Sequence, residues 1–421
     1  MSMPPLLPNL SELIPWTDRR GRFNTMRATV LGFLVAPGLY VGARWALGLL
    51  GPEPVNAAIH ATGYYAVWIL LASLVVSPWK ALAAAPNVVV IRRMMGNAAL
   101  LYAMLHLGLY ATDQHWRLFT IVSEIVKRFY LTIGFVALLG LFVLGATSTD
   151  AWVRHLGKRW KQLHRGVYAL AVLGLFHYAL QSKLDVSQAL LAVGVFAWLM
   201  LWRALPAGRD RAWYWLLAIT LAAAAVTLAC EYLWYRFGTR INPEKVVLGE
   251  LDISYGLHPA VQVLVLGVLA TGLVELRRLA NSAPEAAPPI TMATYALAGV
   301  IGEAMPWFFG WQVGDVSVDE PYPWVRAGIW VALLAILGLM RCRLSATPQR
   351  PWIDTLLAAC IVYDIAWLTT DDPRVVTYGA GLLVAGAVIL GAFAWSARRG
   401  GAVMLVPLVA LLVYQAALTL N

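Results

Sequence analysis

Continuous apolar runs recur along the whole chain, and short polar or charged segments separate them. Each run is long enough for a helix to cross a hydrocarbon core about 30 Å thick. Apolar residues fill the runs without the alternation of a barrel strand, so the pattern predicts transmembrane helices. The thirteen expected spans are 27–49, 57–77, 96–112, 129–147, 163–181, 187–205, 213–235, 257–275, 290–309, 324–340, 352–370, 376–396 and 403–420.

The composition agrees with a polytopic membrane protein. Of the 421 residues, 60% are hydrophobic and 13% are charged, whereas a soluble protein has about 25% charged residues. We therefore expect an all-α integral membrane protein, with a six-helix bundle over 1–207 and a second bundle of about seven transmembrane helices over 208–421. Cys230, Cys342 and Cys360 show no CxxC or metal-ligand spacing, so we expect no disulfide framework.

Charge divides the chain at "LPAGRDR" (205–211). Residues 1–211 contain 20 Lys/Arg and 8 Asp/Glu, whereas residues 212–421 contain 12 and 14. If the N-terminus is cytoplasmic, the cytoplasmic segments of the first bundle hold fifteen basic residues and the opposite side holds five. The basic excess therefore indicates membrane orientation and no nucleic-acid partner, and Arg19, Arg20 and Arg22 are expected to flank an uncleaved first helix.

Four of the seven histidines fall inside or at the edge of expected spans, all in the first bundle: His60, His106, His164 and His177. An ionisable side chain inside a membrane is costly and tends to mark function. For any single histidine, a neutral imidazole bonded to a backbone carbonyl is the equally weighted structural explanation. Three histidines on neighbouring helices favour a cofactor, because imidazole is a common ligand of haem iron and helix bundles build such sites from facing helices.

The depth of these histidines suggests two levels in the membrane. His106 and His177 can both lie in the outer half of the bilayer, and His164 lies at the inner edge, about 20 Å from His177 along one helix. Thirteen steps of about 100° leave His164 and His177 on different faces of a straight helix. Either the helix departs from ideality near Gly166 or Gly174, or the two imidazoles face different neighbours.

Five stretches of the first half carry a family resemblance: "GPEPVNAAIHATGYYAVWILLASLVVSP" (51–78), "RRMMGNAALLYAMLHLGLY" (92–110), "EIVKRFYLTIG" (124–134), "ATSTDAWVRHLGKRWKQLHRGVY" (146–168) and "HYALQSK" (177–183). Their order and spacing resemble the MsrQ (YedZ) family, within the ferric-reductase-like transmembrane group. The resemblance covers about residues 27–205. Members end soon after the sixth helix, and the seven further expected spans of this chain are not recognised.

The resemblance implies a b-type haem cytochrome of the bacterial inner membrane, with one or two haems and FMN as a further cofactor. It implies an electron-transfer subunit that takes electrons from the quinone pool and passes them to a periplasmic molybdenum-containing reductase (MsrP-like). The haem-associated histidines of the family carry over onto His106, His164 and His177. The "IHATG" stretch places His60 near the outer surface, as an alternate ligand or a supporting group.

Several cationic and aromatic residues lie near the expected span ends. Arg92, Arg93, Arg159 and Arg165 are candidates for binding haem propionates, a flavin phosphate or a quinone headgroup, although ordinary topological charge is the more common explanation. Trp160 could stack on a flavin or quinone ring, or could be an interfacial anchor. Arg128 is one of few outer-side charges and is a candidate for propionate binding or for docking an acidic partner.

The second bundle offers weaker signals. Glu303, Asp354 and Asp364 fall within or near spans and could serve a proton relay or ion site. The acidic stretches 315–320 and 371–372 are expected to be solvated loops. The chain has no GxGxxG fingerprint and no Walker A sequence, which favours a lipid-soluble quinol or a separate flavoprotein as electron donor.

Three functions therefore stand as hypotheses. The first is an electron-transfer subunit of an oxidoreductase system rather than a complete enzyme. The second is a transporter or sensor in which the added half moves a substrate and the haem bundle regulates or drives it. The third is a metal reductase that acts on external ferric or cupric ions.

Overall fold

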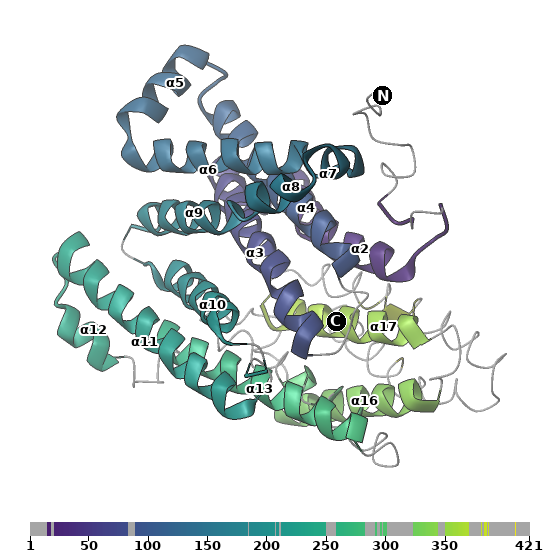
Figure 1. The fold of residues 1–421 in the computed structure, drawn as a ribbon. Helices are drawn as coiled ribbons and strands as arrows, with labels where there is room; N and C mark the ends of the chain where they lie inside the picture. The colour runs from purple at the N-terminus through teal and green to yellow at the C-terminus, as the bar shows by residue number, and fades with distance from the viewer. Residues whose placement is uncertain are drawn as a thin grey trace. The chain divides into compact units, whose positions relative to one another are not determined.

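The computed structural model describes a helical membrane protein (Figure 1). The described residues are 15–17, 21–82, 89–183, 185–206, 208–209, 212–249, 258–282, 291–292, 295–296, 298–300, 323–343, 350–369, 380, 383–384, 386 and 409. Among these residues there is no β-strand beyond an isolated bridge between Thr17 and Phe23. This agrees with the all-α fold class expected from the continuous apolar runs.

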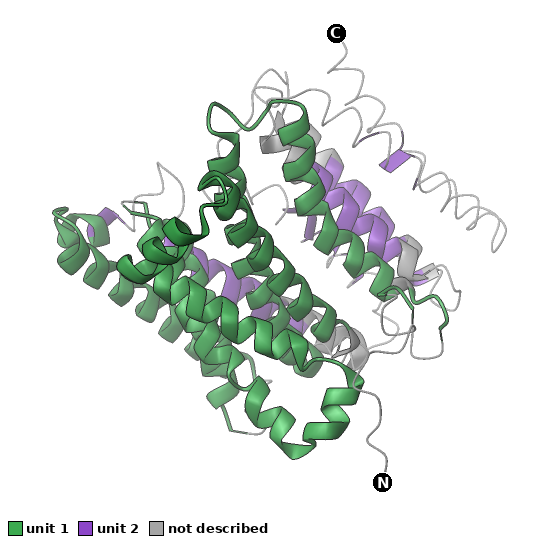
Figure 2. Ribbon diagram, turned by 90° about the horizontal axis from the view of Figure 1, so that it is seen from above, with its two compact units in different colours: residues 1–247 green, residues 248–421 purple. Residues whose placement is uncertain are grey.

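Two compact units divide the chain, residues 1–247 and residues 248–421 (Figure 2). The expected domain boundary at 207/208 stays a prediction, and the helix that follows that boundary belongs to the first compact unit. The described helices of the first unit are α2 (Thr25–Ala46), α3 (Pro54–Leu82), α4 (Val89–Asp113), α5 (Leu118–Lys127), α6 (Phe129–Ala146), α7 (Asp150–Leu156), α8 (Lys158–His164), α9 (Val167–Gln181), α10 (Ser187–Ala204) and α11 (Trp213–Gly238), and the short α12 (Pro243–Gly249) crosses the division at residue 247.

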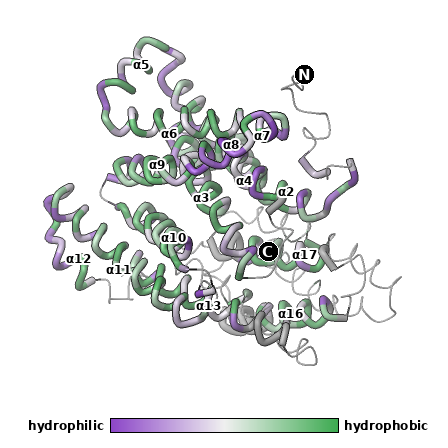
Figure 3. Tube along the Cα trace, viewed as in Figure 1, coloured by the Kyte–Doolittle hydropathy of each residue, from purple (hydrophilic) through white to green (hydrophobic). Residues whose placement is uncertain are grey.

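Six described helices are long and apolar enough to cross a membrane, and all six lie in the first unit. They are α2, α3, α4, α6, α10 and α11, and their tubes are mostly coloured as hydrophobic in Figure 3. Together with the transmembrane family reported below, they make this a multi-pass membrane protein. The six helices agree with the expected spans 27–49, 57–77, 96–112, 129–147, 187–205 and 213–235 to within a few residues, apart from α3, which extends to Leu82, and α4, which already begins at Val89.

The fifth expected span, 163–181, is wrong at its start. Helix α8 ends at His164 and α9 begins at Val167, with a turn at Arg165 and Gly166 closed by the bond from Gly166 N to Leu163 O (2.9 Å). The expected span began at Leu163, ahead of the turn, whereas the polar and basic sequence KRWKQLH (158–164) forms the separate short helix α8 and the apolar run proper begins at Val167. His164 and His177 therefore stand on different helices, and their imidazoles face different neighbours.

Tyr102 of α4 fastens α2 to the bundle. Helix α2 contains Pro37, and the Tyr102 hydroxyl inserts between the backbone groups of Leu34 and Gly38, next to this proline. The hydroxyl accepts from Gly38 N (2.7 Å) and donates to Leu34 O (2.8 Å), two groups that would pair with each other in a regular helix. A side chain inserted into the ladder is one of the recognised causes of a helix kink.

Arg203 of α10 donates hydrogen bonds to a carbonyl of α3 that a proline leaves without its helical N–H donor. Pro78 has no N–H, so Leu74 O lacks its usual donor four residues later. The guanidinium donates to Leu74 O (2.6 Å) and to Leu199 O (2.7 Å), and its Nε donates to the Tyr168 hydroxyl (3.3 Å). One half-buried cation thus links α3, α9 and α10.

The second unit has its own apolar core. Its described helices are α13 (Pro259–Ser282), α16 (Pro323–Arg343) and α17 (Arg350–Thr369), which correspond to the expected spans 257–275, 324–340 and 352–370. Trp330 and Leu334 of α16 pack against Ile353 and Cys360 of α17, and all four are fully buried. The expected spans 290–309, 376–396 and 403–420 lie almost entirely outside the described residues.

Candidate cofactor site

His106 projects from α4 toward α3, which packs along it. Its Nδ1 lies 2.8 Å from the carbonyl oxygen of Ile59. A carbonyl can only accept, so Nδ1 carries the proton and donates, and Nε2 keeps its lone pair. The ring lies against Gly63, where a Cβ atom would come 3.0 Å from Nδ1. This contact orients the imidazole before any ligand is bound.

His177 projects from α9 toward α6 in the same manner. Its Nδ1 lies 2.8 Å from the carbonyl oxygen of Tyr130, and again the carbonyl fixes Nδ1 as the donor. The ring lies against Gly134, where a Cβ atom would come 2.7 Å from both Nδ1 and Cε1. Within the part of the chain that the structure describes, neither His106 nor His177 has a hydrogen bond at Nε2.

The structure brings these two imidazoles together. The ring centroids of His106 and His177 are 6.3 Å apart and the ring planes differ by 84°. An imidazole nitrogen binds a metal ion at about 2 Å and lies about 1.1 Å from its own ring centre, so two rings on opposite sides of one ion have centroids about 6.2 Å apart. The observed separation fits a pair of axial ligands.

The donor set also fits a metal-bound group. Histidines that bind metals usually donate their other ring N–H to a carbonyl or carboxylate, which fixes the tautomer and raises the basicity of the ligating nitrogen. Both histidines meet this condition through Ile59 and Tyr130. No cluster of three or more His, Cys, Asp or Glu capable of holding a metal occurs among the described residues. Two imidazoles supply two ligands, which would suit a metal-containing prosthetic group such as haem.

Aromatic residues lie beside the histidine pair. Tyr64 of α3 and Tyr178 of α9, next to His177 in the chain, meet edge to face with centroids 6.5 Å apart. Tyr64 also contacts Tyr65, at 5.6 Å. The sequence analysis did not single out these tyrosines, since tyrosine is common in membrane helices. His60, which follows Ile59 on α3, is exposed and makes no described hydrogen bond.

His164 lies in a different environment near the other end of α6. Its Nδ1 lies 3.2 Å from Trp160 O, and its Nε2 lies 3.2 Å from Leu144 O and 3.4 Å from the Ser148 hydroxyl. Residues 130 and 144 are about 21 Å apart along α6 at 1.5 Å per residue. His164 therefore faces carbonyls on both sides, and the structure does not bring it to His106 or His177.

Trp160 covers one face of the His164 ring. Its ring stacks on the His164 ring at 4.0 Å between centroids and 25° between planes. Its indole Nε1 donates to Thr147 O (2.9 Å), one of the carbonyls left open at the end of α6. The contact fastens α8 to the end of α6, and Trp160 thus has a structural role in addition to any role in binding a ring.

The basic candidates are placed as follows. Arg93 forms an ion pair with Asp150 at the start of α7 (2.7 Å). Arg92 is half-buried, and both arginines lie close enough to His164 to act on it electrostatically. Arg165 is exposed at the turn between α8 and α9.

Arg128 lies near the opposite end of α6 from His164. Its Nη1 donates to the Tyr130 hydroxyl (3.1 Å), and its Nε pairs with Glu124. The hydrogen bond to Tyr130 and the nearby Glu124 carboxylate raise the pKa of this exposed guanidinium. Arg128 is thus tied to Tyr130, the residue whose carbonyl holds His177.

Of the carboxylates singled out in the second half, the structure describes Asp354 and Asp364, which lie ten residues apart on α17. Asp354 accepts from Arg341 Nε (2.6 Å) and from the Tyr295 hydroxyl. Asp364 is buried in α17, ten residues further along. Glu303 and the acidic stretches 315–320 and 371–372 lie outside the described residues.

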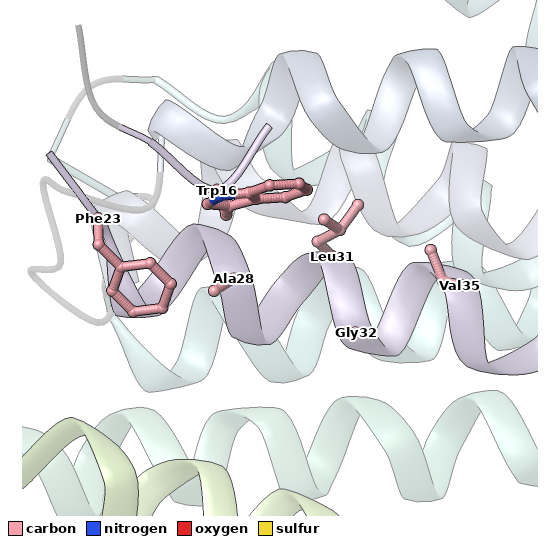
Figure 4. A pocket seen from close by; sticks show the side chains of 6 residues that line it. All are labelled: Trp16, Phe23, Ala28, Leu31, Gly32 and Val35. Carbon is pink, nitrogen blue, oxygen red and sulfur yellow. The ribbon is translucent and has the colours of Figure 1, made fainter. Parts of the chain in front are cut away.

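One apolar depression occurs at the start of α2 (Figure 4), and it does not contain the candidate residues. Its lining carries no ionisable side chain and consists of Trp16, Phe23, Ala28, Leu31, Gly32 and Val35. An apolar surface of this kind near the end of a membrane helix is suited to contact with lipid.

Comparison with known proteins finds one matching family and several similar relatives. Residues 57–175 match the family described as ferric reductase like transmembrane component. The protein-methionine-sulfoxide reductase heme-binding subunit MsrQ of Rhodospirillum rubrum is 41% identical over 196 residues, which are 46% of this chain and 92% of that protein. The subunit of the same name from Xanthomonas axonopodis pv. citri is 38% identical over 155 residues, 37% of this chain and 71% of that protein. No solved structure matches this chain.

Proposed function

The chain belongs to the MsrQ family, and we propose that its first unit is a b-type haem subunit that carries electrons across the membrane. The observation that carries the proposal is the His106–His177 pair, with its 6.3 Å centroid separation and two carbonyl-bonded Nδ1 atoms. His106 of α4 and His177 of α9 would hold the haem iron. When bound, haem supplies one-electron exchange at a potential set by its ligands and surroundings.

The chain's own residues prepare the ligands and exclude competing reactions. Ile59 O and Tyr130 O hold the two Nδ1 protons, so both imidazoles present Nε2 in the neutral form that binds iron. The apolar helices around the pair keep water away, which limits side reactions of a reduced cofactor. Tyr64 and Tyr178 fill space beside the pair and would help to set the polarity of the slot.

We assign the position around His164 to the donor side of the electron path. His164, Trp160, Arg92, Arg93 and Arg165 gather at the cytoplasmic side under the orientation given by the positive-inside rule. A stacked aromatic ring and nearby cations suit a planar group that carries polar or anionic oxygens, such as a quinone, FMN or a second haem. His164 would then act as the ligand of a second haem or as a hydrogen-bond donor to a quinol headgroup.

The acceptor side would face the periplasm, with the N-terminus cytoplasmic in the bacterial inner membrane. The printed name of the relatives makes them subunits of a methionine sulfoxide reductase. By this relationship the electrons would leave to a periplasmic molybdenum-containing reductase (MsrP-like). Arg128, exposed near the His177 end of α6, could contact an acidic surface of that partner, and His60 is a further exposed group on the neighbouring α3.

Electron delivery tests the proposal. The full chain, purified in detergent and inserted in vesicles, should bind b-type haem, and a quinol should reduce it anaerobically. Addition of an oxidised MsrP-like reductase with methionine sulfoxide should then reoxidise it in proportion to the sulfoxide added. A haem that no quinol reduces would contradict the assigned donor, and reoxidation by chelated ferric iron but not by the reductase would favour the metal-reductase hypothesis.

A further inference from the structure

The two imidazole contacts share one plan. In each, a histidine Nδ1 lies 2.8 Å from a carbonyl oxygen 47 residues earlier in the chain, Ile59 for His106 and Tyr130 for His177. In each, a glycine follows that carbonyl by four residues, Gly63 in one case and Gly134 in the other. The carbonyl residue, the glycine and the histidine of the second contact each lie 71 residues after their counterparts in the first.

The surrounding helices repeat in the same order. Helix α3 supplies the first carbonyl and glycine and packs along α4, which supplies the first histidine. Helix α6 supplies the second carbonyl and glycine and packs along α9, which supplies the second histidine. The site is therefore built from two equivalent helix pairs, each of which contributes one prepared imidazole.

Helix geometry explains why the glycine follows the carbonyl by four residues. Side chains of an α-helix lean toward its N-terminus, so a side chain at position i+4 covers the carbonyl oxygen of residue i. A glycine at that position leaves the oxygen open to a second donor from a neighbouring helix. That oxygen can accept both the helical N–H and the imidazole N–H, because a carbonyl has two lone pairs.

The two glycines leave different amounts of room. A Cβ atom at Gly134 would lie 2.7 Å from Nδ1 and Cε1 of His177 and 3.0 Å from its Cγ, which no real structure tolerates without movement. A Cβ atom at Gly63 would lie 3.0 Å from Nδ1 and 3.1 Å from Cε1 of His106, which is tight but less severe. Two other glycines near the histidines, Gly108 of α4 and Gly174 of α9, have nothing within 4 Å of such an atom.

We propose that Gly63 and Gly134 are positioning residues of a duplicated ligand-holding motif: a carbonyl, a glycine four residues later, and an imidazole 47 residues after the carbonyl. The motif fixes the tautomer, plane and depth of both rings, and it rests on the proposed haem function. Neither glycine has a side chain that could bind iron. Each acts through its histidine, so its replacement should change the properties of the ligand more than the amount of folded protein.

Four single variants of the full chain test this inference: Gly63→Ala, Gly134→Ala, and the controls Gly108→Ala and Gly174→Ala. All four exchange a helical glycine for alanine and share the same gain in helix propensity, about 1 kcal/mol. We expect Gly134→Ala to weaken haem retention by at least about tenfold, as loss of a group that supports a metal ligand typically does. Gly63→Ala should have a smaller effect, and both should shift the electron paramagnetic resonance signal and the midpoint potential of the haem that remains.

A second measurement uses the haem-free protein. Gly134→Ala should lower the Tm of the depleted chain, and His177→Ala should restore much of that loss, because the clash needs both side chains. The motif is overturned if the haem spectra and potentials of Gly63→Ala and Gly134→Ala match those of the controls, or if all four variants lose haem equally. It is also overturned if Gly134→Ala and His177→Ala have additive effects on the Tm. A wild-type chain without haem would instead refute the proposed function and the inference with it.

Discussion

The link between Arg203 and the carbonyl exposed by Pro78 permits a quantitative test of the first unit's architecture. Arg203→Met removes hydrogen bonds to Leu74 O, Leu199 O and the Tyr168 hydroxyl while keeping an unbranched side chain. Hydrogen bonds from a charged donor contribute about 1.5–3 kcal/mol each, but the new methionine recovers part of this by burial. We expect the free energy of unfolding to fall by about 3 kcal/mol.

Pro78→Ala changes that cost in a predictable direction. Alanine at position 78 supplies the N–H that Leu74 O lacks, so the carbonyl stays paired when the guanidinium is absent. In this background Arg203→Met should cost only about 1–2 kcal/mol, which corresponds to a coupling of about 1–2 kcal/mol between the two positions. Arg203→Lys should be intermediate, because a single ammonium cannot reach three acceptors on three helices with the same geometry.

Unfolding by a denaturing detergent, followed by circular dichroism, measures all four members of the cycle on the full chain. Helices of both units contribute to the circular dichroism signal. The free energies of unfolding are therefore compared for the transition that shifts in Arg203→Met. Purely additive effects of Pro78→Ala and Arg203→Met would show that the guanidinium does not serve the carbonyl at Leu74. The reasoning would also fail if Pro78→Ala increased the cost of losing Arg203.

Three further predictions concern other parts of the chain. Tyr102→Phe removes the hydroxyl between Leu34 O and Gly38 N and should lower the free energy of unfolding by about 1–2 kcal/mol, which thermal melting would register and which an unchanged Tm would contradict. Trp160→Phe keeps a ring but loses the indole N–H, so quinol-driven haem reduction should slow while haem content holds; an unaltered rate would exclude a donor-side role. Asp354→Asn breaks a partly exposed ion pair and should change stability by less than about 1 kcal/mol, with haem reduction unaffected; slowed reduction would favour the proton-relay hypothesis.

The membrane helices of the first unit could be predicted because they depend on a local property. A run of apolar residues such as 129–147 forms a helix in lipid whatever surrounds it, and α6 covers 129–146. The turn at Arg165 and Gly166 could not be placed this way, because hydropathy shows where the polar segment 158–166 gives way to the apolar run but not where one helix ends and the next begins. Its presence decides that His164 belongs to α8 and faces the end of α6.

The histidines of the candidate site were identifiable from the cost of placing them in lipid, but the groups that hold them were not. Tyr130 and His177 are 47 residues apart, and their contact depends on how α6 packs along α9. Gly63 and Gly134 look like ordinary membrane-helix glycines until the imidazoles are seen against them. Arg203 was counted as topological charge, since its carbonyl partner in α3 is 129 residues earlier in the chain.

The ligand assignment is tested most directly by the reduced-minus-oxidised optical spectrum of the purified full chain, compared among wild type, His106→Ala, His177→Ala and His164→Ala. Axial binding by the first two histidines predicts that either of their substitutions abolishes the sharp α band of the haem held between α4 and α9, and that His164→Ala leaves that band in place. Undiminished α bands in both His106→Ala and His177→Ala would contradict it.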